Sequence, residues 1–276
     1  MYDPVKYKQG AIDNWNKVAP DYHGEWAGVG RGPFQSTKEL VAAASVKEGH
    51  CVLDLACGTG AVSAQVAARL GPSGMLVGID FSRGALEIAR EGVTSGHFAE
   101  MDAENIGLAT KFDRVLCQFA LMFFPDPASV LGRIASLLKN DGRLAVGVHG
   151  TERGVPYFST IMGPVLRHIP DLRPDGTPTV HRLGEPADLE RLLASAGFVD
   201  VAVEKFVFGY NAGTFDEYWS DYMSTTAASI RSRIETKGVE VVAAIRKEAR
   251  EAAEPFTHSK EIKFPWDVLV ATGANG

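Results

Sequence analysis

The chain has 276 residues, of which 45% are hydrophobic and 22% are charged, the balance of a globular protein with one large domain or one domain with additions. This balance excludes a disordered, collagen-like or coiled-coil chain. Acidic residues number 34 against 28 lysines and arginines, and the net charge of −6 lacks the basic surface of a general nucleic-acid binder.

Residues 1–45 form the first predicted segment, and their pattern is helical. The large apolar residues recur at spacings of three and four, as on one face of a helix: Trp15, Val18, Tyr22 and Trp26. A glycine-rich break at 28–33 separates this helix from a short second one at about 34–44. We expect these residues to form an N-terminal helical lid.

From residue 46 the pattern changes to alternating strands and helices. Short apolar runs predict five strands, at residues 51–55, 75–80, 97–101, 112–118 and 143–149. Helices are predicted between them at residues 59–70, 82–93 and 127–139. Strands that alternate with single helices form a parallel sheet covered on both faces, so we expect a doubly wound α/β core.

After residue 150 the alternation pauses. Residues 151–183 are rich in proline and glycine, with one predicted helix at 157–168. The remaining predicted elements are a helix at 186–196, a strand at 198–208, two helices within 214–254 and a strand at 266–271 that has Pro265 at its start or in a bulge. We therefore expect a mostly parallel seven-stranded sheet within residues 46–276, with cap insertions at 151–183 and 214–254.

The three cysteines, Cys51, Cys57 and Cys117, cannot all pair within the chain and show no CxxC or CxxH spacing. Neither a disulfide framework nor a structural zinc site is therefore expected. Residues 1–10 lack the apolar run of a signal peptide, and no apolar stretch reaches the ~18 residues of a membrane span. We expect a cytoplasmic protein without a metal or a membrane-inserted segment.

The strongest motif is the run VLDLACGTG at residues 52–60, between the first strand and its helix. Small residues there let the backbone approach a ligand, and the helix N-terminus offers free amides. A nicotinamide-binding loop has the pattern GxGxxG, but Ser63 stands where its third glycine belongs. Asp54, at the strand end, would oppose a pyrophosphate and suits a ligand with an ammonium group, such as S-adenosylmethionine (SAM).

Two more acidic residues follow the next two strands. Asp80 can accept hydrogen bonds from both hydroxyls of a ribose, and Phe81 beside it offers a face to adenine. Asp102 can accept from the exocyclic amine of adenine, and the backbone amide of Ala103 can reach a ring nitrogen. Ligands of open α/β sheets bind outside the carboxyl ends of the strands, so acids at three successive strand ends predict a nucleoside-like ligand.

These motifs resemble those of the class I SAM-dependent methyltransferases, and more closely the small-molecule group that includes the ubiquinone and menaquinone-biosynthesis methyltransferases. The resemblance covers residues 46–150 in the motifs and extends more loosely to residue 272. It implies a Rossmann-like sheet that ends in an antiparallel hairpin, and SAM as the cofactor. The cofactor-binding residues that we expect are Asp54, Ala56, Gly58, Thr59, Gly60, Asp80, Phe81, Asp102, Ala103, Gln118, Phe119 and Tyr22.

Methyl transfer from a sulfonium ion is an in-line displacement, in which the enzyme mainly positions both reactants and excludes water. A base is needed only where the nucleophile starts protonated, and the candidates are His149, at the end of the fifth strand, and His23. Aromatic residues cluster in three places outside the sheet: the N-terminal helix, residues 119–124 and residues 218–223. They predict a pocket for a small apolar or aromatic acceptor, with the methylated atom left open.

Three other functions remain open from the sequence. A nicotinamide-dependent oxidoreductase has a similar sheet, and a SAM-binding protein without turnover would keep the same acids. A nucleic-acid or protein methyltransferase is disfavoured by the acidic balance and by the run Gln118–Leu121, which lacks an aromatic-plus-proline motif. We expect a small-molecule acceptor, no nucleic-acid partner, and a monomer or homodimer.

Overall fold

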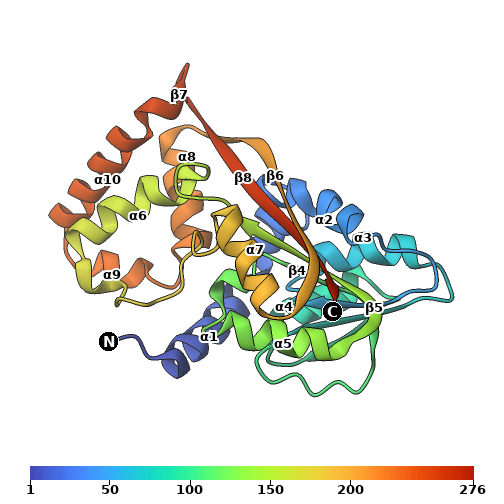
Figure 1. Ribbon diagram of the computed structural model, residues 1–276. Helices are drawn as coiled ribbons and strands as arrows, with labels where there is room; N and C mark the ends of the chain where they lie inside the picture. The colour runs from blue at the N-terminus through green and yellow to red at the C-terminus, as the bar shows by residue number, and fades with distance from the viewer.

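A computed structural model describes residues 1–276 and shows a central sheet with helices on both faces and a helical cap at one end (Figure 1). The strand order is β3-β2-β1-β4-β5-β8-β6, with β7 paired to β8 outside this path. The strands are β1 (Cys51–Leu55), β2 (Met75–Asp80), β3 (His97–Glu100), β4 (Phe112–Gln118), β5 (Leu138–His149), β6 (Phe198–Gly213), β7 (Thr257–His258) and β8 (Glu261–Asn275). The predicted doubly wound, mostly parallel α/β sheet is confirmed, with β7 as an additional short strand.

Strands β1 to β5 pair in parallel, and β8 runs antiparallel between β5 and β6. The β6–β8 hairpin implied by the resemblance is therefore present, but it is longer than predicted at both strands. Its extension has the alternation of a half-buried strand, because Ile262, Phe264 and Trp266 are buried while Lys263 and Pro265 between them are exposed. Gly209 and Pro265, which stand next to the predicted strand ends at residues 208 and 266, are paired with each other within the hairpin.

Pro265 lies inside β8, not at its start or in a bulge as predicted. Its backbone partner across the hairpin is Gly209 on β6. On the other side, β5 pairs with β8 only from Val268 onward. That flank of the strand is free at Pro265, so the missing backbone N–H removes no bond to β5.

The helices also follow the predicted order, with differences of a few residues at their ends. They are α1 (Pro4–Tyr22), α2 (Thr37–Ala43), α3 (Ala61–Leu70), α4 (Arg83–Gly92), α5 (Pro127–Leu137), α6 (Pro156–His168), α7 (Pro186–Ser195), α8 (Phe215–Asp221), α9 (Arg231–Glu235) and α10 (Val239–Ala253). Residues 214–254 contain three α-helices and a π-helical turn at Tyr222–Thr226, where two helices were predicted. No helix is long and apolar enough to cross a membrane.

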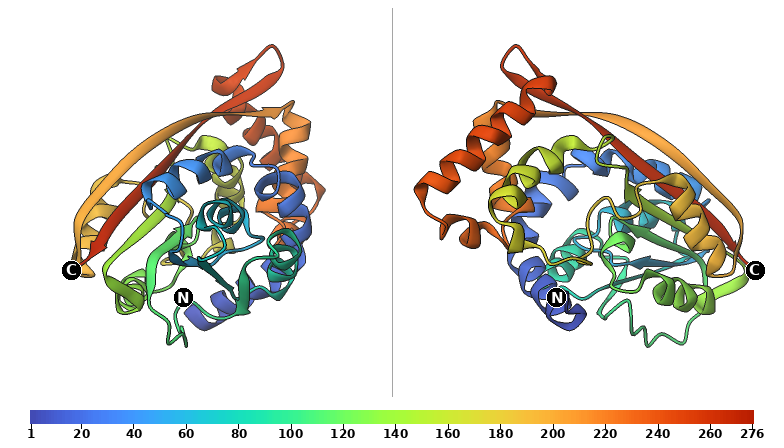
Figure 2. Two further views of the ribbon diagram at one scale, coloured as in Figure 1. Left: turned by 90° about the vertical axis from the view of Figure 1, so that its right-hand side faces the viewer. Right: turned by 60° about the vertical axis from the view of Figure 1, so that its left-hand side comes forward.

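Helices α6, α8, α9 and α10, which we call the cap, lie at the outer end of the long hairpin, where α10 packs against α6 (Figures 1 and 2). The cap does not have a core of its own. Val52 and Val268 of the sheet belong to the same hydrophobic cluster as Tyr218 and Ile245 of the cap. A second cluster lies between the sheet and helices α5 and α7. The cap is thus an extension of one sheet face.

The N-terminal helix α1 packs against α4 and continues into a π-helical turn, His23–Ala27. Pro20 lies in its last turn, which is where the helical hydrogen bonding changes. Of the predicted apolar face, Val18 and Trp26 are buried. This places α1 beside the carboxyl ends of the strands, the edge where the sequence predicts a ligand.

Candidate functional site

The loop between β1 and α3 has the backbone of a ligand cradle. Ala56 and Gly58 are both in the left-handed region, at φ 53°. A Cβ atom added to Gly58 would meet no atom within 4 Å, so this backbone faces open space. At Gly60 a Cβ would lie 3.3 Å from Ala89 of α4, and Gly60 does not line the cavity described below. The glycine at 58 therefore opens the loop to a ligand, and the glycine at 60 lets α3 and α4 pack closely.

Asp80, at the end of β2, holds this loop in place. It is 6% exposed, and its two carboxylate oxygens accept hydrogen bonds of 2.8 Å from the backbone N–H groups of Gly58 and Ser82. Burial raises the pKa of Asp80 above its usual value. Each oxygen retains acceptor capacity, so a pair of vicinal hydroxyls could bind here without displacing the backbone contacts.

Asp54, at the end of β1, is almost completely buried and accepts a 2.6 Å hydrogen bond from the hydroxyl of Ser63. Burial raises its pKa to about 7, and the neighbouring charge of Asp80 acts in the same direction. No cation of the chain pairs with Asp54. A buried carboxyl group with a raised pKa and no cationic partner fits a ligand that supplies its own positive charge.

Three residues of the N-terminal segment make polar contacts with the loops at the strand ends. The Nζ of Lys8 lies 2.9 Å from Oδ2 of Asp102 and also pairs with Glu104. Asn16 accepts hydrogen bonds of 3.0 Å from the Ser82 hydroxyl and the Gly84 N–H. The predicted base His23 does not line the cavity, and its Nδ1 is 2.9 Å from Oγ1 of Thr59.

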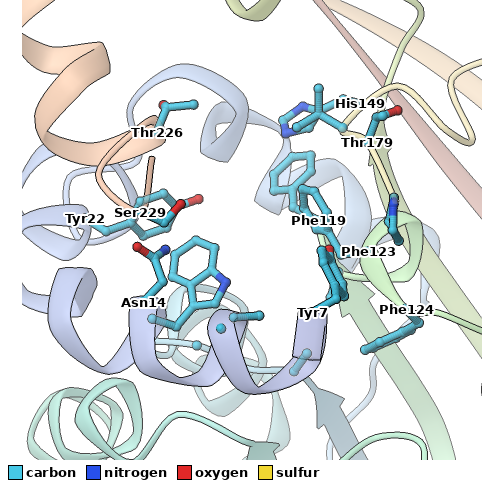
Figure 3. A pocket seen from close by; sticks show the side chains of 18 of the residues that line it. Tyr7, Asn14, Tyr22, Phe119, Phe123, Phe124, His149, Thr179, Thr226 and Ser229 are labelled. Atoms are coloured by element: carbon cyan, nitrogen blue, oxygen red, sulfur yellow. The ribbon is translucent and has the colours of Figure 1, made fainter. Parts of the chain in front are cut away.

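A single large cavity of about 990 Å³ lies beneath this segment (Figure 3). It is lined by all of the predicted cofactor residues except Gly60, and by His149. We call the part formed by the loops after β1, β2 and β3 the strand-end side. We call the part formed by α6, the segment before α7, the ends of β4 and β5, and β8 the cap side. Its lining includes Phe119, His149, Tyr157, Phe158, His181 and Trp266. Tyr22 faces this space opposite Phe119 (Figure 3).

Residues after β4 and β5 meet at the centre of the cavity. Gln118 is tied to the start of α2 by a 3.0 Å hydrogen bond from the hydroxyl of Thr37. Phe119 has a left-handed backbone at φ 56°, and its ring stacks on His149 with centroids 4.5 Å apart. Strained backbone of this kind persists where the surroundings enforce it, often at functional sites. The turn after β4 therefore aims Phe119 into the cavity.

His149 is 6% exposed, and its Nδ1 accepts a 3.1 Å hydrogen bond from the indole N–H of Trp266. Burial lowers the pKa of His149 to about 3. The ring is therefore neutral at physiological pH. Because an indole nitrogen can only donate, the ring proton of His149 sits on Nε2.

The sequence did not predict a place in the site for several cap-side residues, although His181 is among the weaker candidate bases. Tyr157 and Phe158 come from α6, and His181 comes from the irregular segment before α7. No motif marks them, because their position depends on how the cap folds back onto the sheet. Of the predicted aromatic stripe at 218–223, only Tyr222 lines the cavity, while Tyr218 is buried against Tyr157.

Comparison with known proteins agrees with this geometry. A family described as "Methyltransferase domain" matches residues 46–170. The chain is 33% identical to aklanonic acid methyltransferase DauC of a Streptomyces species, with the match covering 58% of this chain and 80% of that protein. The chain belongs to the class I SAM-dependent methyltransferases. It is also 31% identical to a demethylmenaquinone methyltransferase of Listeria monocytogenes, over 48% of this chain and 58% of that relative's length.

The fold of this methyltransferase is shared with solved structures at low sequence identity. A SAM-dependent methyltransferase of Thermotoga maritima aligns with a TM-score of 0.54 and 17% identity, over 96% of this chain and 99% of that one. The protein is a methyltransferase of the small-molecule type, and SAM is its cofactor.

The strand-end side fits SAM on observations of this structure alone. The backbone of Gly58 faces open space, Asp54 lacks a cation, and Asp80 has free acceptor capacity. When bound, SAM supplies a methyl group on a positively charged sulfur. The chain's own residues would then bind the amino-acid end, hold the ribose and exclude water from the reacting centre.

Proposed function

We propose that this methyltransferase transfers the methyl group of SAM to a planar, largely apolar aromatic molecule by in-line displacement. The observation that carries the proposal is a cluster of aromatic side chains in the lining of the cap side. Tyr157, Phe158 and Trp266 lie there with ring centroids within 5.0 to 5.4 Å of one another. Such a wall favours flat apolar ligands, with a few polar groups for orientation.

The size of the cavity supports two molecules at once. Ligand pockets usually measure ~300–1000 Å³, and the volume of about 990 Å³ lies at the top of that range. The strand-end side would hold SAM through Asp54, Gly58, Asp80 and Asp102, and Phe119 would line the path of the methyl group. The acceptor would then lie on the cap side.

We further propose that residues 1–45 act as a lid and that residues 151–183 and 214–254 act as a cap on the core. The contacts of Lys8, Asn16 and His23 with the strand-end loops support the role of the lid. A lid that covers the cofactor would exclude water during the displacement. Aklanonic acid and demethylmenaquinone are the acceptors that the relatives' names state, and they support an aromatic or quinone acceptor here.

The test is a turnover screen with SAM that carries a deuterated methyl group. The purified protein is incubated with two panels, one of naphthols and hydroxyquinones and one of small charged acceptors such as glycine and phosphoethanolamine. Mass spectrometry should find the labelled methyl only in products of the first panel. Turnover confined to the charged panel would contradict the proposal.

A further inference from the structure

Two histidines on the cap side have fixed and opposite hydrogen-bonding polarity. His149 receives the indole N–H of Trp266 at Nδ1, so its Nε2 carries the proton and can only donate. His181 lies 2.9 Å from the carbonyl oxygen of Gly150 through its Nδ1. A carbonyl can only accept, so Nδ1 of His181 carries the proton and its Nε2 presents a free lone pair.

Neither Nε2 atom has a partner in the chain. The Nε2 of His181 is buried without any hydrogen bond. The only side-chain hydrogen bond of His149 is the one from Trp266 to Nδ1, so its Nε2 also has no partner in the chain. Buried polar atoms are normally satisfied, and an unpartnered one on a cavity wall is explained if a ligand completes it.

The two imidazoles belong to one part of the cavity. Both line it, and both contact the ring of Phe158, with centroid distances of 5.1 Å for His149 and 5.8 Å for His181. His149 also stacks on Phe119, which follows β4 and which we propose to line the path of the methyl group. A ligand against Phe158 can therefore meet a fixed donor and a fixed acceptor.

We propose that His181 receives the proton of an aromatic hydroxyl of the acceptor, while His149 donates a hydrogen bond to a carbonyl oxygen of the same ring system. This inference rests on the proposed function and narrows it to hydroxylated aromatic ketones or quinones. It also changes the role of His149 from the base predicted from sequence to a donor, because its only lone pair is already engaged.

The proton and electrons balance in this scheme. The hydroxyl oxygen forms the new bond to the methyl carbon as the carbon–sulfur bond breaks, and the electron pair of that bond stays on the sulfur. The hydroxyl proton moves to Nε2 of His181, and the resulting imidazolium releases it to water. Burial keeps the pKa of His181 below its usual value, so the ring is neutral and able to accept at pH 7.

The charged groups around His181 are Glu152, which favours its protonation, and Arg173, which opposes it. Besides burial, His181 is the only titratable group that affects the pKa of His149. The pH at which His181 stops accepting is thus set mainly by burial. Below that pH, its preference for a ligand hydroxyl should disappear.

The test measures binding to the protein saturated with S-adenosylhomocysteine, using 7-hydroxy-1-tetralone, whose hydroxyl cannot reach its own carbonyl, and 1-tetralone as probes. We expect the wild type to bind the hydroxylated probe about ten-fold more tightly at pH 8, the effect of one good hydrogen bond, and to lose this preference as the pH falls through the pKa of His181. His181→Phe should abolish the preference and retain affinity for 1-tetralone. His149→Phe should weaken both probes by a similar factor, because both carry the carbonyl.

His258→Gln, at an exposed position on β7, serves as the matched control and should behave as the wild type. Thermal unfolding of each variant checks its fold, and His181→Gln replaces the phenylalanine variant if that one does not fold. A preference that persists in the His181 variants, or that is absent from the wild type, overturns the inference. Failure of S-adenosylhomocysteine itself to bind would instead contradict the assignment of the strand-end side to the cofactor.

Discussion

The strand-end side and the cap side of the cavity differ in how the sequence encodes them. On the strand-end side, each residue occupies a fixed place next to a strand end. Asp80, for example, binds backbone N–H groups of the two neighbouring loops, those of Gly58 and Ser82. On the cap side, the walls come from α6, the segment before α7, the end of β5 and the hairpin strand β8. Their contacts are between side chains far apart in the chain, such as Trp266 and His149.

This difference separates the part of the cavity that the family motifs predict from the part that they do not. Local turns and strand-end acids are set by the sheet, so they recur wherever the sheet binds the same cofactor. Aromatic packing between distant segments is set by each chain separately. We therefore expect substitutions on the two sides to have separable effects, and the following predictions are ordered from the largest effect to the smallest.

Tyr157→Ala should give the largest loss, and on the cap side. Tyr157 is buried and contacts the rings of Trp26, Tyr218 and Trp266, so its truncation leaves a cavity in the aromatic cluster. We expect the free energy of unfolding to fall by about 3–5 kcal/mol, measured by chemical denaturation. Trp219→Ala, at a half-buried position, is the comparison and should cost less. If the folded variant lost affinity for S-adenosylhomocysteine as strongly as it lost stability, the two sides would not be separable.

Asp80→Ala should give the largest loss of cofactor affinity. It removes the acceptor for two backbone N–H groups and for the ribose hydroxyls that we propose to bind there. Hydrogen bonds to a charged group are worth about 1.5–3 kcal/mol each, so loss of two corresponds to at least a hundred-fold weaker binding of S-adenosylhomocysteine by calorimetry. Asp175→Ala, at an exposed loop position, should leave the affinity unchanged. An affinity close to the wild-type value in Asp80→Ala would place the ribose elsewhere.

Asp54 should make cofactor binding and stability depend on pH in opposite directions. Its pKa is about 7 in the folded chain against 3.8 ordinarily, so the folded state retains a proton that the unfolded chain has released between those values. Relative to Asp54→Asn, the free energy of unfolding should therefore decline as the pH rises from about 4 to 7, by up to about 1.4 kcal/mol per pH unit.

The affinity for S-adenosylhomocysteine should change the other way. The ionised carboxylate attracts the ligand's ammonium group, so affinity should rise over the same interval in the wild type and remain flatter in Asp54→Asn. Parallel pH profiles of the two proteins, in both denaturation and calorimetry, would show that Asp54 does not titrate in this range.

The sequence predicted the strand-end side well for a physical reason. A buried apolar run, a loop of small residues and an acid at each strand end are local features, and parallel pairing brings them together without further information. Gly60 shows the limit of the motif, since it belongs to the same run but serves helix packing. The contact of His23 with Thr59 was not foreseen because it joins residues of different elements.

The cap side could not be predicted in this way. The extension of β6 and β8 depends on pairing between two segments with about fifty residues between them, and local glycine and proline signals point against it. The tautomers of His149 and His181 are set by Trp266 and by the carbonyl of Gly150, which only the folded chain brings into contact. Composition indicated an aromatic pocket but not its polar groups.

Hydrogen exchange measured with and without S-adenosylhomocysteine tests the division of the cavity most directly. The account predicts protection on ligand addition in the loops at residues 56–60, 80–84 and 101–104 and in α1, which contacts them through Lys8 and Asn16. It predicts no change in α7 or at the outer end of the β6–β8 hairpin. Protection centred on the cap, with the three strand-end loops unchanged, would contradict the assignment of the cofactor to the strand-end side.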